Sequence, residues 1–519
     1  MHSIHDRITW IWVPLVSALL IAIFSDPIVI PDSYEQVIVA ECWHSGISSK
    51  INCAQIEDFF RPPLPSALIV PWLTWFDGLT ALSIVTFLST IALFGILIHS
   101  LNHRLGNILD FDIGWWVGLT LLVAGLGTDL AILLDSKWLA LPWLFAGGGL
   151  LMRRELSIRT SALSAFFFGG AFLCRLENII VLCLGLCWII WKARQRALAT
   201  LSYLLILGVF IGGWVFLLWN EHQILTLSPR FWESSLIPLL NEMPLRWVQD
   251  LYGMGIWNPP FREMAMTYTT SMDSAPNLLS NFSLLEWSTW FRIHILGLFH
   301  PLHTVGLLGT LTVLKDSTWR HIFAGLILIS LPSIAVTLLP QGRESTFPIV
   351  YVLPLWIATW TWTGLMFGLF ADHFGNRISR VNTISILVLS SWISPEIKIP
   401  QMIEKSEPGL ATQHWLNTQT PDNAIVLSTF ETAPIVWLAN REWQEWPSPW
   451  SMQHRIKLLQ QTDRPIYAIV WNNDVHPWYS LSFTERYHPP KAYINKAKES
   501  FVVFDLSSEW SEARPQNAF

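Results

Sequence analysis

The sequence predicts an α-helical polytopic membrane protein, with about eleven transmembrane helices and a small C-terminal α/β domain outside the cytoplasm. Hydrophobic residues make up 52% of the 519 residues and charged residues only 13%, which is more apolar surface than a soluble core buries. Apolar runs near 20 residues, long enough to span the hydrocarbon core, recur up to residue 399. Beyond Pro400 the apolar runs shorten and turn residues bound them, so a soluble domain is expected there.

The predicted spans are taken in chain order from the length of each apolar run. They are 8–24, 79–99, 113–130, 136–152, 160–174, 179–191, 197–219, 296–314, 321–339, 347–370 and 381–393. No small-residue cleavage site follows the first run, so it is interpreted as a retained span instead of a signal peptide. Many of the 31 tryptophans fall at the ends of these runs, where an interfacial aromatic belt would place them.

Lysines and arginines in the short connections set the expected orientation. They occur between alternate pairs of spans, at Arg104, Arg153, Arg154, Arg159, Lys192, Arg194, Arg196, Lys315, Arg320, Arg377 and Arg380. The positive-inside rule places these connections and the N-terminus in the cytoplasm of a plasma (inner) membrane protein. The odd number of spans then places the C-terminal end outside. Outer loops are expected at 25–78 and 220–292.

Two domains follow from this pattern. Residues 1–399 form the predicted transmembrane domain, and residues 400–519 form the predicted extracytoplasmic α/β domain. In the second, strands are expected at 424–428, 466–471 and 501–505, with helices at 411–418 and 451–461.

Several function classes find little support in the sequence. The net charge is −6 and no polybasic run is present, so a nucleic-acid partner is not expected. The sequence contains no internal repeat, Walker A motif, HExxH or paired CxxC, and no metal site or other cofactor is predicted. Cys42 and Cys53 flank a polar stretch, and they can form a disulfide only if that loop faces an oxidising compartment.

The first outer loop holds the most informative motif, Pro31-Asp32-Ser33-Tyr34-Glu35. A helix is expected to begin at Asp32, which fits an N-cap role. A general base also requires a carboxylate held rigidly at the membrane surface, and the two roles are compatible. The loop returns to the membrane at Arg61-Pro62-Pro63, where proline favours an extended residue before it.

Charged residues also stand at the outer ends of later spans. They are Asp129, Asp135, Arg175, Glu177, Arg343 and Glu344. A charge inside lipid costs at least about 2.5 kcal/mol, so such positions are candidates for function. One interpretation is structural: Arg175 pairs with Glu177, and Arg343 pairs with Glu344 or a lipid headgroup. The other is functional: the carboxylates serve as base and positioning groups, while the arginines hold a phosphate.

The order of these motifs resembles the GT-C membrane glycosyltransferases. Asp-Ser-Tyr-Glu follows the first span, Arg-Pro-Pro-Leu-x-Ser precedes the second, Leu-x-Arg-x-Glu follows the fifth, and an arginine precedes x-x-x-Phe-Pro at a late span. The layout is similar to bacterial relatives of the protein O-mannosyltransferases and of the lipid A aminoarabinose transferases. The tail, with Trp415-Leu416 and then Thr420-Pro421-Asp422, is similar as well.

The resemblance implies a transferase that moves a sugar from a polyprenyl-phosphate donor to an acceptor at the outer face of the membrane, with inversion. It implies that Asp32 takes the acceptor proton and that Asp135, in preference to Asp129, is the second catalytic carboxylate. Arg175 and Arg343 would hold the leaving lipid phosphate. The remaining substrate-binding candidates are Tyr34, Glu35, Arg61 and Glu177.

Two departures from the family pattern bear on these roles. Ser33 follows Asp32 where these enzymes often have Glu, so an Asp-Glu metal site is not expected. Glu344 follows Arg343 where Tyr is common. The alternative function is a transporter or flippase for a lipid-linked or polar substrate, which would favour inverted repeats and broken spans. A third alternative is a scaffold protein without activity.

Overall fold

The computed structural model describes the following residues of the chain: 4–24, 28–29, 31–45, 62–105, 113–128, 133–153, 155–222, 302–338, 353–373, 407–428, 432–445, 464–471, 491–493 and 501–505. The chain divides into two compact units. The first comprises Met1–Val29 and Phe60–Lys398, and the second comprises Ile30–Phe59 and Ile399–Phe519. The start of the first outer loop, helix α2 (Pro31–Ser45), therefore groups with the C-terminal unit.

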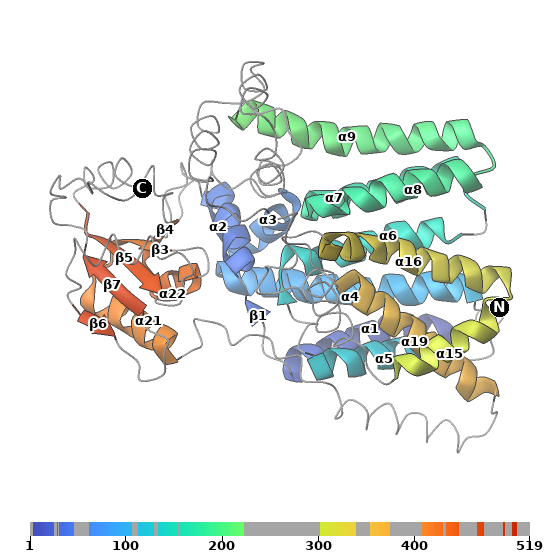
Figure 1. Ribbon diagram of the computed structural model, residues 1–519, viewed down its shortest axis with the longest axis horizontal. Helices are drawn as coiled ribbons and strands as arrows, with labels where there is room; N and C mark the ends of the chain where they lie inside the picture. Colours follow the sequence, from blue (N-terminus) through green and yellow to red (C-terminus); the bar gives the residue numbers. More distant parts are fainter. Residues whose placement is uncertain are drawn as a thin grey trace, which may run out of the picture. The chain divides into compact units, whose positions relative to one another are not determined.

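The first unit is a bundle of apolar helices (Figure 1). The long helices are α1 (Ile4–Phe24), α4 (Gly78–Leu105), α5 (Ile113–Thr128), α6 (Ser136–Leu151), α7 (Ile158–Cys174), α8 (Ile179–Lys192), α9 (Arg196–His222), α15 (His303–Val313), α16 (Ser317–Leu338) and α19 (Leu353–His373). Every predicted span except 381–393, which lies outside the described residues, coincides with one of them. The total of eleven spans stays a prediction.

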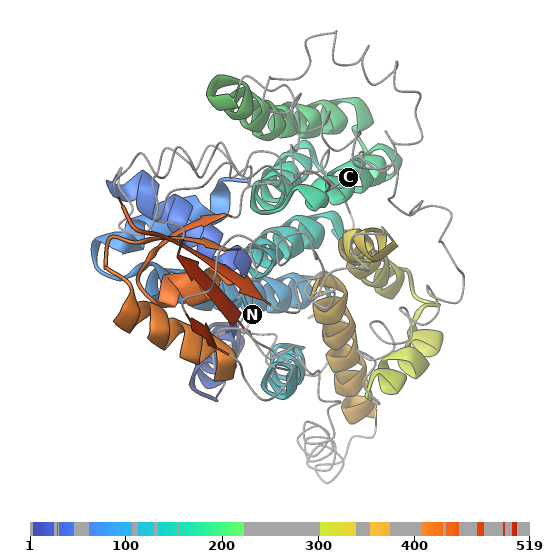
Figure 2. The same ribbon diagram turned by 60° about the vertical axis from the view of Figure 1, so that its left-hand side comes forward.

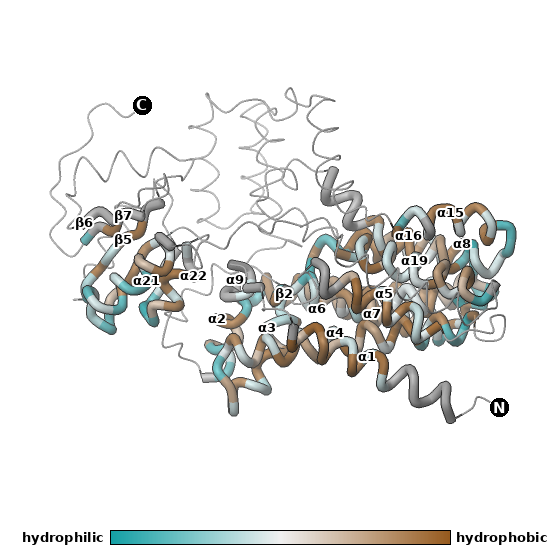
Figure 3. Tube along the Cα trace, turned by 90° about the horizontal axis from the view of Figure 1, so that it is seen from below, coloured by the Kyte–Doolittle hydropathy of each residue, from teal (hydrophilic) through white to brown (hydrophobic). Residues whose placement is uncertain are grey.

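Three helices in the described part of the chain are long and apolar enough to cross a membrane. They are Gly78–Leu105, Arg196–Asn220 and Leu353–Asp372. Figure 3 shows hydrophobic residues along most of α4 and along the coloured part of α1. On α9, Leu198, Leu205, Val209 and Phe216 are all exposed, a costly arrangement in water but the expected one against lipid acyl chains. The fold is therefore that of a polytopic membrane protein.

Within the bundle, α4, α6, α7 and α9 lie side by side in that order, and α5 packs against both α1 and α19. Between α3 (Leu64–Ile69) and α4 the chain forms the short 3-10 helix η2 (Val70–Thr74). A two-stranded parallel pair joins β1 (Ile28–Val29) to β2 (Leu133–Leu134). Because β2 leads directly into α6, this pair fixes the start of α6 against the end of the segment that follows α1.

Glycines let α6 and α7 approach closely, as small residues do in membrane bundles. A Cβ built on Gly170 would stand 2.4 Å from Cε3 of Trp143. Gly170→Ala is therefore expected to overpack the interface and lower stability by about 1–3 kcal/mol. Gly208 on α9 has no atom within 4 Å of its built Cβ, so Gly208→Ala should leave stability unchanged or raise it.

Thermal unfolding of the full chain in detergent measures this difference. A similar change in melting temperature for the Gly170→Ala and Gly208→Ala variants would show that this close approach does not hold the bundle together.

The second unit contains a five-stranded sheet in the order β4-β3-β5-β7-β6 (Figure 2, orange to red). Its strands are β3 (Ile425–Ser428), β4 (Glu442–Glu445), β5 (Ile466–Trp471), β6 (Lys491–Tyr493) and β7 (Phe501–Asp505). β3 is parallel to β4 and β5, whereas β7 is antiparallel to β5 and β6. The predicted strands at 466–471 and 501–505 coincide with β5 and β7. The predicted helix at 451–461 lies outside the described residues.

Two helices of this unit, α21 (Glu407–Gln419) and α22 (Ala433–Leu438), are held to the sheet by one buried arginine. Arg441, only 3% exposed, donates from Nε to Thr420 Oγ1 at 2.9 Å. It also donates from Nη2 to the Thr420 carbonyl at 2.8 Å and from Nη1 to the Ala439 carbonyl at 3.1 Å. Such bonds offset the cost of burying its charge.

The structure of helix α2 tests two predictions, the N-cap role of Asp32 and the disulfide of Cys42. The helix begins at Pro31, so the predicted N-cap role of Asp32 is wrong and Asp32 lies in the first turn. Proline suits the first helical position because its missing N–H would have no helical partner there. A carboxylate in the first turn is favoured by the helix dipole.

Cys42 in α2 is disulfide-bonded, and Cys53 lies outside the described residues.

Candidate active site

A buried carboxylate lies at the start of α6. Asp135 directly follows β2, and its backbone is extended (φ −141°, ψ 155°) as is usual before a helix. Its carbonyl accepts a hydrogen bond from the Leu139 N–H at 3.1 Å. Its side chain does not cap the helix. Instead, Oδ1 accepts a 3.0 Å hydrogen bond from Ser136 Oγ, and the residue is fully buried.

An arginine from the turn between α7 and α8 reaches the same place. α7 ends at Cys174, and the extended backbone of Arg175 (φ −153°, ψ 124°) turns the chain into the short 3-10 helix η4 (Leu176–Asn178). Arg175 donates from Nε to Glu177 Oε1 at 2.8 Å and from Nη1 to Ser136 Oγ at 3.3 Å. Asn178 fixes the turn by donating to the Ala171 carbonyl at 2.8 Å.

The Ser136 hydroxyl therefore links two residues that stand 40 positions apart in the chain. Its oxygen accepts from Arg175 while its proton goes to Asp135. We name Asp135, Ser136, Lys137, Arg175 and Glu177 the outer-end cluster, after the side of the membrane that the sequence predicts for these residues. Lys137 Nζ lies 3.9 Å from Asp135 Oδ2, so the cluster combines two carboxylates with two basic groups.

Neighbouring positive charges favour the ionised form of Glu177. Burial alone would raise the pKa of Glu177, but the positive charges of Arg175 and Lys137 and the hydrogen bond from Arg175 together lower it. Arg175 is 14% and Glu177 26% exposed at the side chain, so the pair is partly shielded from water. A guanidinium held in this way is preorganised to meet a phosphate group without changing its position.

Three predicted site residues, Asp135, Arg175 and Glu177, thus come together. The predicted structural pairing of Arg175 with Glu177 is also present, so both interpretations of that pair stay compatible with the geometry. Asp32, Tyr34 and Glu35 lie in α2, in the second unit, and their side chains are outside the described residues. Arg61, Asp129 and Arg343 are outside the described residues as well.

Sequence reasoning missed Ser136 and Lys137. The sequence feature that could have identified them is their position, because a hydroxyl and a cation directly follow the carboxylate of Asp135 at the start of an apolar run. The described residues contain no group of three or more His, Cys, Asp or Glu side chains placed to hold a metal ion. The expectation that the protein uses no metal stays a prediction.

The short β1–β2 pair precedes both predicted catalytic carboxylates in the chain. The pair is parallel, with Val29 opposite Leu134, so both strands end on the same side of the pair. Asp135 comes directly after β2, and Asp32 comes three residues after β1. Both predicted catalytic carboxylates therefore follow the carboxyl ends of paired strands along the chain.

Comparison with known proteins gives structural neighbours only. No protein-family model and no curated protein sequence matches the chain. Two crystal structures of ArnT from Cupriavidus metallidurans align with most of the chain. The apo structure has a TM-score of 0.43 at 13% identity and covers 96% of both chains. The structure bound to undecaprenyl phosphate has a TM-score of 0.43 at 12% identity, covering 96% of this chain and 98% of that one.

Proposed function

We propose that this chain is a GT-C-type glycosyltransferase that moves a sugar from a polyprenyl-phosphate donor to an acceptor at the outer face of the membrane. The observation that carries the proposal is the outer-end cluster, in which Arg175 is held by Glu177 and Ser136 next to the buried Asp135. A fixed guanidinium beside a carboxylate matches the needs of a reaction that expels a lipid phosphate.

The two ends of α6 support a proposed membrane side for the cluster. Its first residue, Ser136, belongs to the outer-end cluster. At its other end the chain reaches Arg153, whose carbonyl accepts a 3.1 Å hydrogen bond from Lys192 Nζ. Arg153 and Lys192 are two of the residues that the positive-inside rule places in the cytoplasm. We therefore propose that the cluster lies in the outer leaflet; the disulfide bond of Cys42 supports an oxidising compartment for the loop that follows α1.

The proposed reaction inverts the anomeric carbon in one displacement. Asp32 takes the proton from an acceptor hydroxyl, and the acceptor oxygen forms a bond to the anomeric carbon as the bond to the phosphate oxygen breaks. The electron pair of the broken bond stays on the polyprenyl phosphate, which leaves with one more negative charge. Arg175 and Arg343 stabilise this charge, while Asp135 and Glu177 hold Arg175 and the substrate in place. Tyr34, Glu35 and Arg61 are proposed to contact substrate.

The test uses membranes that contain the full chain and membranes that lack it. Each is supplied with a labelled sugar on polyprenyl phosphate or on a nucleotide. Transfer to endogenous acceptors from the lipid donor alone, and only with the chain present, is the expected result. Transfer from the nucleotide donor would assign a different enzyme class. Movement of the lipid-linked sugar across sealed vesicles without any transfer would instead establish the transporter alternative.

A further inference from the structure

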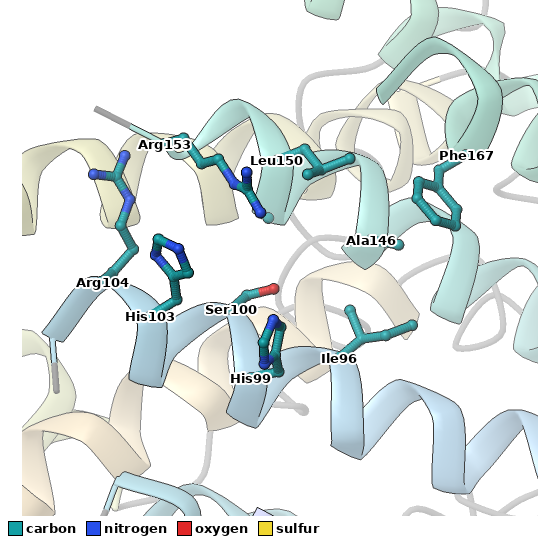
Figure 4. Close-up of a pocket in the computed structure, with 10 residues that line it drawn as sticks. Ile96, His99, Ser100, His103, Arg104, Ala146, Leu150, Arg153 and Phe167 are labelled. Carbon is teal, nitrogen blue, oxygen red and sulfur yellow. The ribbon is translucent and has the colours of Figure 1, made fainter. Parts of the chain in front are cut away.

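A basic cavity lies at the end of the bundle opposite the outer-end cluster. It has a volume of about 210 Å³ and lies between α4, α6 and α7. Figure 4 shows His103, Arg104 and Arg153 on one side of it, with His99 and Ser100 next to them. The residues that line it, all within the described part of the chain, include no Asp or Glu.

The sequence of α4 and a glycine of α6 create this cavity. Ile96, His99, Ser100 and His103 recur at spacings of three and four, so they share one face of α4. Across from them, a Cβ built on Gly149 would stand 2.4 Å from Ser100 Oγ. Any larger residue at position 149 would therefore clash with Ser100 and crowd this part of the cavity lining.

The lining of the cavity changes along the helix axis. Arg104 and Arg153 lie at the end of the cavity where helices α4 and α6 finish. Ile96, Ala146 and Phe167 lie at the opposite end of the cavity, deeper in the bundle and on the other side of the view in Figure 4. Ile96 and Arg104 are separated by about 12 Å along the helix, at a rise of 1.5 Å per residue. The cavity thus presents positive charge near the membrane surface and apolar side chains at greater depth.

This arrangement favours a ligand with one anionic end and one apolar end. The two arginines supply guanidinium donors, and Lys192 lies nearby, donating from Nζ to the Arg153 carbonyl. Arginines match the oxygens of a phosphate group well, and basic pockets between membrane helices suit lipid headgroups. A free phosphate ion would leave the apolar part of the cavity unused.

We infer that this cavity binds the phosphate headgroup of an anionic phospholipid in the leaflet that the sequence predicts to be cytoplasmic. The first part of the acyl region lies along Ile96, Ala146 and Phe167, while Arg104 and Arg153 contact the phosphate. The inference does not depend on the proposed transferase activity, because the cavity and the outer-end cluster lie at opposite ends of α6.

Native mass spectrometry of the full chain in detergent tests the inference. The chain is titrated with short-chain phosphatidylglycerol, with short-chain phosphatidylcholine and with inorganic phosphate. Phosphatidylglycerol is expected to bind at least about tenfold more tightly than the other two, because charge-assisted hydrogen bonds are the strong ones. Equal binding of phosphatidylcholine, or equal binding of inorganic phosphate, would overturn the assignment to an anionic lipid.

Variants locate the site. Arg104→Gln combined with Arg153→Gln is expected to weaken phosphatidylglycerol binding at least about tenfold. Arg159→Gln is the matched control, since Arg159 is an exposed arginine on the same side that does not line the cavity. Gly149→Leu keeps every charge but crowds the cavity next to Ser100, and it should also abolish binding in a variant whose thermal unfolding shows that the bundle still forms. Unchanged binding in either the double variant or Gly149→Leu would overturn the proposal.

Discussion

Sugar transfer by the Asp32→Asn variant is expected to fall by about 10²–10⁴-fold, the usual contribution of a general base. Asparagine keeps the size and shape of the side chain but cannot take a proton from the acceptor. Stability should change little, because a carboxylate in the first turn of a helix contributes only about 0.3–1 kcal/mol. Transfer is measured in membranes with equal amounts of each chain, from a labelled polyprenyl-phosphate sugar.

Glu57→Gln serves as the matched control, since it removes another carboxylate from the same outer loop. Its transfer rate should equal that of the unmodified chain. If Asp32→Asn retained the full rate, Asp32 would not be the base, and the proposed reaction would lose its proton acceptor. A loss of rate in both variants would indicate a general requirement for negative charge in the loop.

Arg175→Met is expected to lower transfer by about 10²–10³-fold, similar to the loss of one donor that stabilises a developing anion. Methionine is of similar length but has no charge and no N–H groups. The expected loss arises because Arg175, held by Glu177 and Ser136, would no longer meet the charge that forms on the leaving phosphate. The rates are measured at several donor concentrations, which separates donor binding from the chemical step.

A double variant separates the functional role of Arg175 from a purely structural one. Arg175→Met leaves the Glu177 carboxylate partly buried without the guanidinium that lowers its pKa. Arg175→Met with Glu177→Gln removes both charges together, so the local fold recovers. If Arg175 only neutralises Glu177, the double variant regains transfer. If Arg175 contacts the phosphate, transfer stays low although the protein folds.

The helices of the bundle were predictable because each depends on a local property, the length of an apolar run. α6 and α8 begin at the first residues of the predicted spans, Ser136 and Ile179. The start of α2 was misplaced by one residue. The pattern favoured Asp32 as an N-cap, whereas proline at Pro31 already has the backbone angle of a first helical residue.

The interactions inside the site were less predictable because they are long-range. The sequence indicated Asp135 and Arg175 as outer charges, but not that Ser136 would bridge them. The basic cavity was missed for the same reason. His99 ends an apolar run and His103 follows it, and only the packing of α6 against α4 brings Arg153 next to them.

The small β1–β2 pair has a consequence for the order of folding. Ile28 pairs with Leu133, so its formation closes a loop of roughly a hundred residues, at an entropic cost on the order of 4 kcal/mol. Strands of two residues cannot offset that cost alone, whereas the packing of α1 against α4 and α5 can. We therefore expect the strands to pair only after α5 has docked. During biogenesis, the backbone in front of Asp135 acquires its final position late, after the neighbouring helices are in place.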